Sequence, residues 1–298
     1  MPTKILPTKD LSEHLLKQVR MHAEKLTVEG KRPHLAVVLV GNNPASKLYV
    51  SRKQQACERY GIGFTLCKLS DEIKQSELND TVAELAEQDE ITGIILQLPL
   101  PTGLNPALAI NKIPTHKDVD GLTALNAGRT AQIVEDTISP ATPLGILRIL
   151  KWQNFDLIGK DVVVIGRSNL VGMPTAVLLS NAGATVTICH KDTKDINIHT
   201  RYADLIVCAA GCPNLVCGTK IKPGAFVIDV GISPAPAGSG RKIVGDVNCD
   251  TTTDVAGVLT PVPGGVGPMT VASLLTNIID AAYVQLDQAK PMWDLHPT

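Results

Sequence analysis

The chain has 298 residues, more than one compact core usually takes, so its length predicts two domains. Its charge is nearly balanced, with 28 Lys and Arg against 29 Asp and Glu, which argues against a protein that binds nucleic acid through a broad basic field. Hydrophobic residues make up 44% and aromatic residues only 3%, so we expect a folded chain with an aliphatic core rather than a disordered one.

The cysteines and the apolar stretches exclude several kinds of protein. Seven cysteines are scattered along the chain, and Cys208, Cys212 and Cys217 lack the paired spacing and nearby histidine of zinc sites. Residues 1–6 have no apolar core of signal-peptide length. The uncharged stretch 255–279 is interrupted by prolines and glycines, which makes a membrane-spanning helix improbable. We therefore expect a cytoplasmic protein without metal or membrane anchor.

Short aliphatic runs alternate with helical patterns along the chain. Strands are predicted at residues 35–40, 93–98, 161–166, 185–189, 205–209 and 225–229. Helices are predicted at residues 11–26, 44–60, 78–85 and 270–288. This alternation is typical of an α/β fold with a mainly parallel sheet and right-handed crossovers.

A domain boundary is predicted at residues 139–145, where two prolines precede a new helical pattern. The first domain would comprise residues 1–142, joined by the C-terminal helix 270–290. The second would comprise residues 143–269 and form a Rossmann-like parallel sheet flanked by helices.

A glycine-containing turn follows the strand at 161–166. Gly166, Arg167, Ser168 and Gly172 lie where a strand meets a helix, the context in which backbone N–H groups bind a pyrophosphate. The match to the dinucleotide motif is imperfect, and a purely structural turn is the alternative. The next strand ends in His190-Lys191 without an acid, and Arg167 lies in the glycine turn. Two cations without an acid favour the 2′-phosphate of NADP over NAD. The alternative is that Lys191 and Arg167 are ordinary surface charges.

Two polar residues share one face of the helix predicted at 44–60. Tyr49 and Lys53 are four residues apart, so their side chains project in the same direction. A lysine amine supports chemistry when burial lowers its pKa, although a surface lysine beside a tyrosine fits the spacing as well. The pair precedes the glycine turn, whereas short-chain dehydrogenases carry such a pair after it.

Three further segments carry polar or rigid features. Gln97 lies at the carboxyl end of a buried strand, where ligand sites of α/β proteins lie, with a structural bond to the backbone as the alternative. The turn 117–121 reads Lys-Asp-Val-Asp-Gly, too few oxygens for a cation site and also consistent with helix capping. The loop 260–270 combines glycines and prolines in a rigid form that typically borders a ligand.

Together these motifs resemble the bifunctional methylenetetrahydrofolate dehydrogenase/methenyltetrahydrofolate cyclohydrolase family. The resemblance rests on Tyr49-x-x-x-Lys53, the segment 96–101, the turn 117–121, Gly166-Arg-Ser168 and the loop 260–270, in that order over nearly the whole chain. It implies NADP-dependent oxidation of 5,10-methylenetetrahydrofolate and hydrolysis of the methenyl product to 10-formyltetrahydrofolate. Both steps would use one active-site cleft between the domains.

The resemblance also implies roles for individual residues. Lys53 would be the main catalytic residue, positioned by Tyr49 and Gln97, while Asp120 would accept hydrogen bonds from the pterin. The folate would be bound by Tyr49, Lys53, Gln97, Leu98, Asp120, Pro263 and Gly265. The NADP cofactor would be bound by Gly166, Arg167, Ser168, His190, Lys191 and Ile232.

Further expectations concern partners and alternatives. The family implies a homodimer, a tetrahydrofolate substrate, and a place in one-carbon metabolism and purine biosynthesis, with no nucleic acid or membrane partner. The alternatives are an enzyme with only one of the two activities, or a nonenzymatic NADP-binding sensor.

Overall fold

The computed structural model describes residues 2–235, 240 and 242–296. The chain divides into two compact units. The six-stranded unit comprises residues 1–13, 142–270 and 295–298 as far as they are described, and the three-stranded unit comprises residues 14–141 and 271–294.

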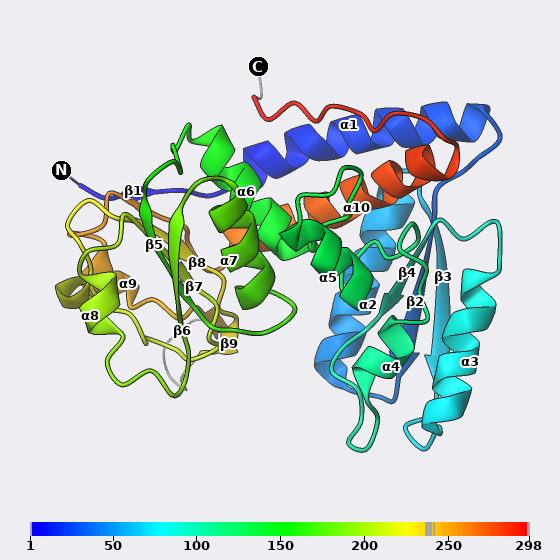
Figure 1. Ribbon diagram of the computed structural model, residues 1–298, viewed down its shortest axis with the longest axis horizontal. Coiled ribbons are helices and arrows are strands. Elements are labelled where there is room, and N and C mark those ends of the chain that lie inside the picture. Colours follow the sequence, from blue (N-terminus) through cyan, green and yellow to red (C-terminus); the bar gives the residue numbers. More distant parts are fainter. Residues whose placement is uncertain (1, 236–239, 241, 297–298) are drawn as a thin grey trace. The chain divides into compact units, whose positions relative to one another are not determined.

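Helices and strands alternate along much of the chain (Figure 1). The helices are α1 (Lys9–Val28), α2 (Pro44–Arg59), α3 (Gln75–Ala86), α4 (Pro106–Ile110), α5 (Ala124–Ala131), α6 (Ala141–Trp152), α7 (Gly172–Asn181), α8 (Asn197–Thr200), the 3₁₀ turn η1 (Gly218–Lys220), α9 (Cys249–Thr252) and α10 (Val266–Gln285). The strands are β1 (Lys4–Ile5), β2 (His34–Val40), β3 (Gly63–Leu69), β4 (Gly93–Leu96), β5 (Asp161–Ile165), β6 (Thr185–Cys189), β7 (Leu205–Cys208), β8 (Phe226–Asp229), β9 (Ser233–Pro234), β10 (Ile243–Val244) and β11 (Val258–Leu259).

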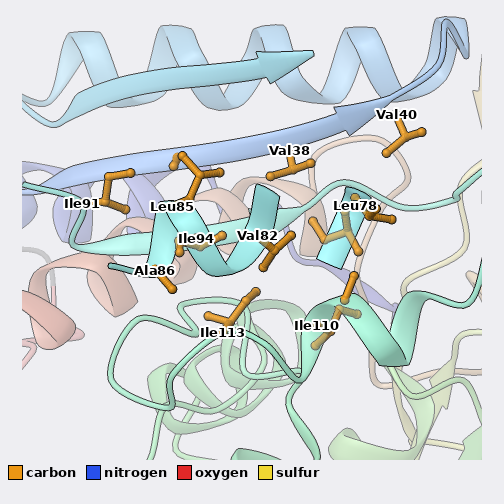
Figure 2. Close-up of a cluster of buried hydrophobic side chains, with 13 residues drawn as sticks. Val38, Val40, Leu78, Val82, Leu85, Ala86, Ile91, Ile94, Ile110 and Ile113 are labelled. Carbon is orange, nitrogen blue, oxygen red and sulfur yellow. The ribbon is translucent and has the colours of Figure 1, made fainter. Parts of the chain in front are cut away.

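The three-stranded unit is built on the parallel sheet β3-β2-β4. Successive side chains of a strand point to opposite faces, so the aliphatic run of β2 supplies apolar groups to both faces. On one face Val38 and Val40 pack with Leu78 and Val82 of α3 in a cluster that is closed to water (Figure 2). Burying each such side chain contributes about 1.5–3 kcal/mol to folding stability. This cluster therefore fixes helix α3 against the sheet that carries the site residues at its carboxyl edge.

The six-stranded unit has the parallel sheet order β1-β11-β8-β7-β5-β6. From β5 the chain goes first to β6 on one side and then to β7 on the other. The order therefore reverses beside β5, and ligands of such sheets bind at the carboxyl ends of the strands at this switch point. Strands β9 and β10 form a separate antiparallel pair.

The predicted α/β class with a parallel sheet flanked by helices is confirmed, and most predicted strands end within two residues of the observed ones. Strand β3 escaped prediction because Thr65 and Lys68 interrupt its apolar residues, so it is not a continuous aliphatic run like the other strands. The last helix was placed too late: it begins at Val266, inside the segment that was expected to be a loop.

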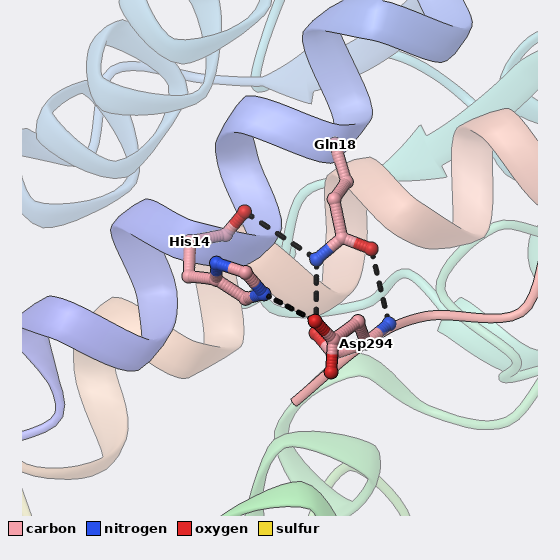
Figure 3. A network of polar contacts seen from close by, with 3 residues as sticks. All are labelled: His14, Gln18 and Asp294. Atoms are coloured by element: carbon pink, nitrogen blue, oxygen red, sulfur yellow. Dashed lines mark hydrogen bonds and ion pairs between the residues drawn. The ribbon is translucent and has the colours of Figure 1, made fainter. Parts of the chain in front are cut away.

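The segment after α10 is tied to α1 within the three-stranded unit (Figure 3). The Gln18 side chain donates to the Asp294 carbonyl at 2.9 Å and accepts from the Asp294 amide at 3.0 Å. His14 Nε2 lies 3.2 Å from the Asp294 carboxylate. Among the described residues, no helix is both long and apolar enough to cross a membrane.

Candidate functional site

Lys53 and Gln97 are joined at the carboxyl edge of the three-stranded sheet. The Asn43 side chain accepts from the amides of Ala45 and Ser46 and begins α2, which then carries Lys53. Lys53 Nζ donates to Gln97 Oε1 at 3.0 Å. The Gln97 amide is oriented in turn, because its Nε2 donates to the Leu98 carbonyl at 2.8 Å. The predicted structural bond of Gln97 to the backbone is therefore present, and the same amide also contacts the Lys53 amine.

Burial controls the protonation of this group of residues. Burial lowers the pKa of Lys53, while the nearby Asp120 carboxylate opposes the shift. Burial likewise raises the pKa of Asp120, and the charge of Lys53 opposes that shift. The neighbouring Cys57 thiol has its pKa raised to about 12, mainly by burial, so it is an inert thiol. Burial therefore shifts the equilibrium of Lys53 toward the uncharged amine, the form that can accept a proton.

Two polar residues of the turn at 117–121, Lys117 and Asp118, make structural hydrogen bonds. Lys117 Nζ donates to the carbonyls of Ala86 and Gln88 at 2.7 and 2.8 Å, which satisfies the end of α3. Asp118 is 1% exposed and accepts from the amides ahead of α5, so the capping alternative holds for this residue.

Asp120 is the member of the turn that has no structural task of this kind. Within the described part of the chain, its carboxylate accepts no hydrogen bond, although it is close enough to Lys53 to shift the pKa of the amine. Gly121 holds the turn in place: its φ is 65°, and a Cβ there would come within 2.7 Å of the Pro140 nitrogen. The turn thus presents Asp120 beside the amine.

The other residues predicted to bind folate lie in both units. Tyr49 is 39% exposed on α2, and Leu98 packs against the core cluster of the three-stranded unit. Pro263 and Gly265 belong to the six-stranded unit. Gly265 is buried, and a Cβ there would come within 2.6 Å of the Pro261 carbonyl oxygen, so this part of the loop requires glycine.

The glycine turn after β5 has the shape that a dinucleotide requires. Gly166 has φ 119°, and a Cβ there would lie 2.1 Å from the Ala209 carbonyl oxygen at the end of β7. A Cβ at Gly172 would lie 2.1 Å from the Gly166 carbonyl oxygen. Ser168 Oγ accepts from the amide of Val171 at 3.2 Å, ahead of α7. The glycine turn and the N-terminus of α7 therefore fit the pyrophosphate of a nicotinamide cofactor at the switch point.

The end of β6 differs from the sequence expectation in one respect. Arg167 Nη2 lies 3.6 Å from the Asp192 carboxylate, and His190 Nδ1 lies 3.5 Å from the same oxygen. The expectation that no acid lies near Arg167 was therefore wrong, because the chain turns back after β6 and brings Asp192 beside Arg167 and His190. Lys191 and Ile232 are exposed in this unit.

Two buried acids that the sequence reasoning missed support the loops at the carboxyl ends of β7 and β8. Asp246 Oδ2 accepts from the amides of Ala210 and Gly211 at 2.7 and 3.0 Å. Asp229 accepts from the amides of Asp246 and Val247, both at 2.9 Å. An acid directly after the apolar run of β8 was the available signal, since a buried carboxylate must find donors.

Comparison with known proteins places this architecture in a family. Residues 6–120 match the catalytic domain of tetrahydrofolate dehydrogenase/cyclohydrolase, and residues 140–286 match the NAD(P)-binding domain of the same family. The bifunctional protein FolD of Campylobacter jejuni is 44% identical over 283 residues, which are 95% of this chain and 99% of that protein. The FolD of Dechloromonas aromatica is 45% identical over 282 residues, covering 95% and 98% of the two chains.

Solved structures agree. The crystal structure of the C. jejuni bifunctional enzyme FolD superposes with a TM-score of 0.92 at 43% identity, covering 95% of this chain and 99% of that one. The FolD of Trypanosoma brucei, solved with NADP cofactor and an inhibitor, gives 0.91 at 34% identity, covering 96% and 99%. The fold and the glycine turn define an α/β nicotinamide-nucleotide enzyme. The chain belongs to the tetrahydrofolate dehydrogenase/cyclohydrolase family, as the sequence motifs predicted.

Proposed function

We infer that the protein is a bifunctional enzyme of folate one-carbon metabolism. It oxidises 5,10-methylenetetrahydrofolate to the 5,10-methenyl compound with NADP and hydrolyses that compound to 10-formyltetrahydrofolate. Membership of the family over nearly the whole chain supports both activities. The observation that carries the chemistry is the buried amine of Lys53, 3.0 Å from Gln97 and close to Asp120.

Hydrolysis depends on the uncharged form of Lys53. Its amine takes a proton from water as the oxygen bonds to the electrophilic methenyl carbon, and it returns this proton to the ring nitrogen as the carbon–nitrogen bond breaks. The remaining hydroxyl proton is released to solvent as the formyl carbonyl forms. Gln97 holds the amine through its fixed amide oxygen. Asp120 accepts hydrogen bonds from the pterin, and Tyr49, Leu98, Pro263 and Gly265 complete the folate contacts.

Oxidation needs mainly orientation of the two carbons between which the hydride moves. When bound, NADP supplies the hydride acceptor. The turn at Gly166 and Ser168 binds the pyrophosphate, and Arg167 and Lys191 attract the phosphate charge, with His190 and Ile232 beside them.

The partners follow from the same family. The substrate is a tetrahydrofolate, the assembly is a homodimer, and the product supports purine biosynthesis. The seven cysteines are free thiols, which suits the reducing conditions of the cytoplasm.

A spectrophotometric assay tests this function. Purified protein should reduce NADP only when methylenetetrahydrofolate is added, and should separately hydrolyse the methenyl compound. If only one of the two activities is found, the protein is a monofunctional enzyme. If it binds the nucleotide but turns over neither folate, it is a sensor.

A further inference from the structure

An unexpected carboxylate lies beside two of the residues predicted to bind the cofactor, Arg167 and His190. Strands β5 and β6 are paired in parallel with Ile165 opposite Cys189, so the segments that follow them begin side by side. This register brings the Asp192 carboxylate to 3.6 Å from the Arg167 guanidinium and 3.5 Å from His190. The carboxylate is 60% exposed and thus accessible to a ligand.

The two nicotinamide cofactors make opposite demands on such a carboxylate. They differ at the adenosine ribose, where NAD carries a 2′-hydroxyl and NADP a 2′-phosphate. A carboxylate accepts a hydrogen bond from the hydroxyl, and an acid about 20 residues after the glycine turn serves this purpose in dinucleotide-binding domains. A phosphate is repelled by the same carboxylate and must also share Arg167 with it.

We propose that Asp192 is a specificity-determining residue that lets this site accept NAD and moderates its affinity for NADP. The proposal rests on the nucleotide site of the proposed function. In the free protein the Asp192 carboxylate pairs with the Arg167 guanidinium, which the 2′-phosphate would also need. With NAD bound, Asp192 accepts from the ribose hydroxyl, whereas with NADP bound, Arg167 and the exposed Lys191 face the phosphate.

Calorimetric titration of the full chain with NADP and with NAD, without folate, tests the proposal. We expect Asp192→Asn to tighten the binding of NADP about threefold, in line with the strength of an exposed ion pair, and to weaken the binding of NAD about threefold. Asp195→Asn is the matched control: it removes the same charge three residues away, and the asparagine oxygen can still accept from the Asn197 amide. This control should leave the NADP to NAD preference unchanged.

A double-mutant cycle locates the effect. In an Arg167→Gln background, Asp192→Asn should tighten NADP clearly less than it does in the wild type, because the competition for the guanidinium is gone. An unchanged preference in Asp192→Asn, or the same gain in both backgrounds, would overturn the proposal. Turnover of methylenetetrahydrofolate is measured separately, so a failure of the proposed function, seen as no turnover with either nucleotide, is distinguishable from a failure at Asp192.

Discussion

The two candidate sites hold their charges in opposite ways. In the three-stranded unit Lys53 and Asp120 are desolvated, and burial is the largest influence on the pKa of each. In the six-stranded unit Arg167 and Asp192 are 56% and 60% exposed, and water screens their pairing. Burial thus shifts the pKa values of the charged groups at the first site. At the second site the charged side chains stay exposed to water, and a charged ligand can replace that water. Changes at the first site should therefore have far larger effects than changes at the second.

The largest expected effect follows from removing the buried amine. Lys53→Met should lower the rate of methenyl hydrolysis about a thousandfold, since general base catalysis typically contributes 10²–10⁴. Affinity for NADP should stay unchanged. Lys47→Met, which removes an exposed lysine from the same helix α2, should leave both properties intact. Hydrolysis by Lys53→Met at the wild-type rate would contradict the role of the amine.

Asp229, one of the two buried acids among the described residues of the six-stranded unit, tests whether burial has a large effect in this unit as well. Burial raises the pKa of Asp229 to about 6 from an ordinary value of 3.8. A carboxyl whose pKa is raised on folding stabilises the protein fully below its unfolded pKa, and this contribution is lost as the pH rises through about 6. Relative to Asp229→Asn, the wild type should therefore lose about 2.4 kcal/mol of unfolding free energy between pH 4 and pH 7.

Denaturant unfolding of both proteins at several pH values measures this difference. Because asparagine does not titrate, the loss of hydrogen bonds that it causes is a constant offset. A difference that stays flat from pH 4 to pH 7 would show that Asp229 titrates normally.

Asp120 comes next in expected magnitude. Asp120→Asn should raise the KM for the folate about 10- to 100-fold, as expected when a charged hydrogen-bond acceptor is lost. It should also lower the pKa of Lys53 further, because the carboxylate that favours the ammonium form is gone. The rise of hydrolysis with pH would then move to lower pH. Asp80→Asn on the exposed side of α3 is the control, and an unchanged KM in Asp120→Asn would exclude the pterin contact.

The smallest of these effects comes from adding a charge beside the amine. Gln97→Glu should raise the pKa of Lys53, because a carboxylate within hydrogen-bond distance favours the ammonium form. The rise of hydrolysis with pH should move to higher pH by the same amount. Gln55→Glu adds an equal charge to an exposed position of α2 and should not move the profile.

Much of the fold was predictable because the strands are continuous aliphatic runs. Such runs identified β2 and β5, whereas the two-residue strands β1 and β11 are too short to be recognised from sequence. For the site, the four-residue spacing placed Tyr49 and Lys53 on one helix, but only the tertiary structure shows which oxygen meets the amine. Asp192 was missed for a similar reason: it lies beyond the strand end, and a local reversal of the chain returns it to Arg167.

The central claim is that Lys53 provides an uncharged amine, and direct titration of that amine tests it most directly. Lysine residues labelled with ¹³C at Cε can be followed by NMR as the pH is raised, and comparison with Lys53→Met assigns the signal. The account predicts that the Lys53 signal titrates below the ordinary lysine pKa of 10.5. A Lys53 signal that titrates at 10.5 or above would contradict it.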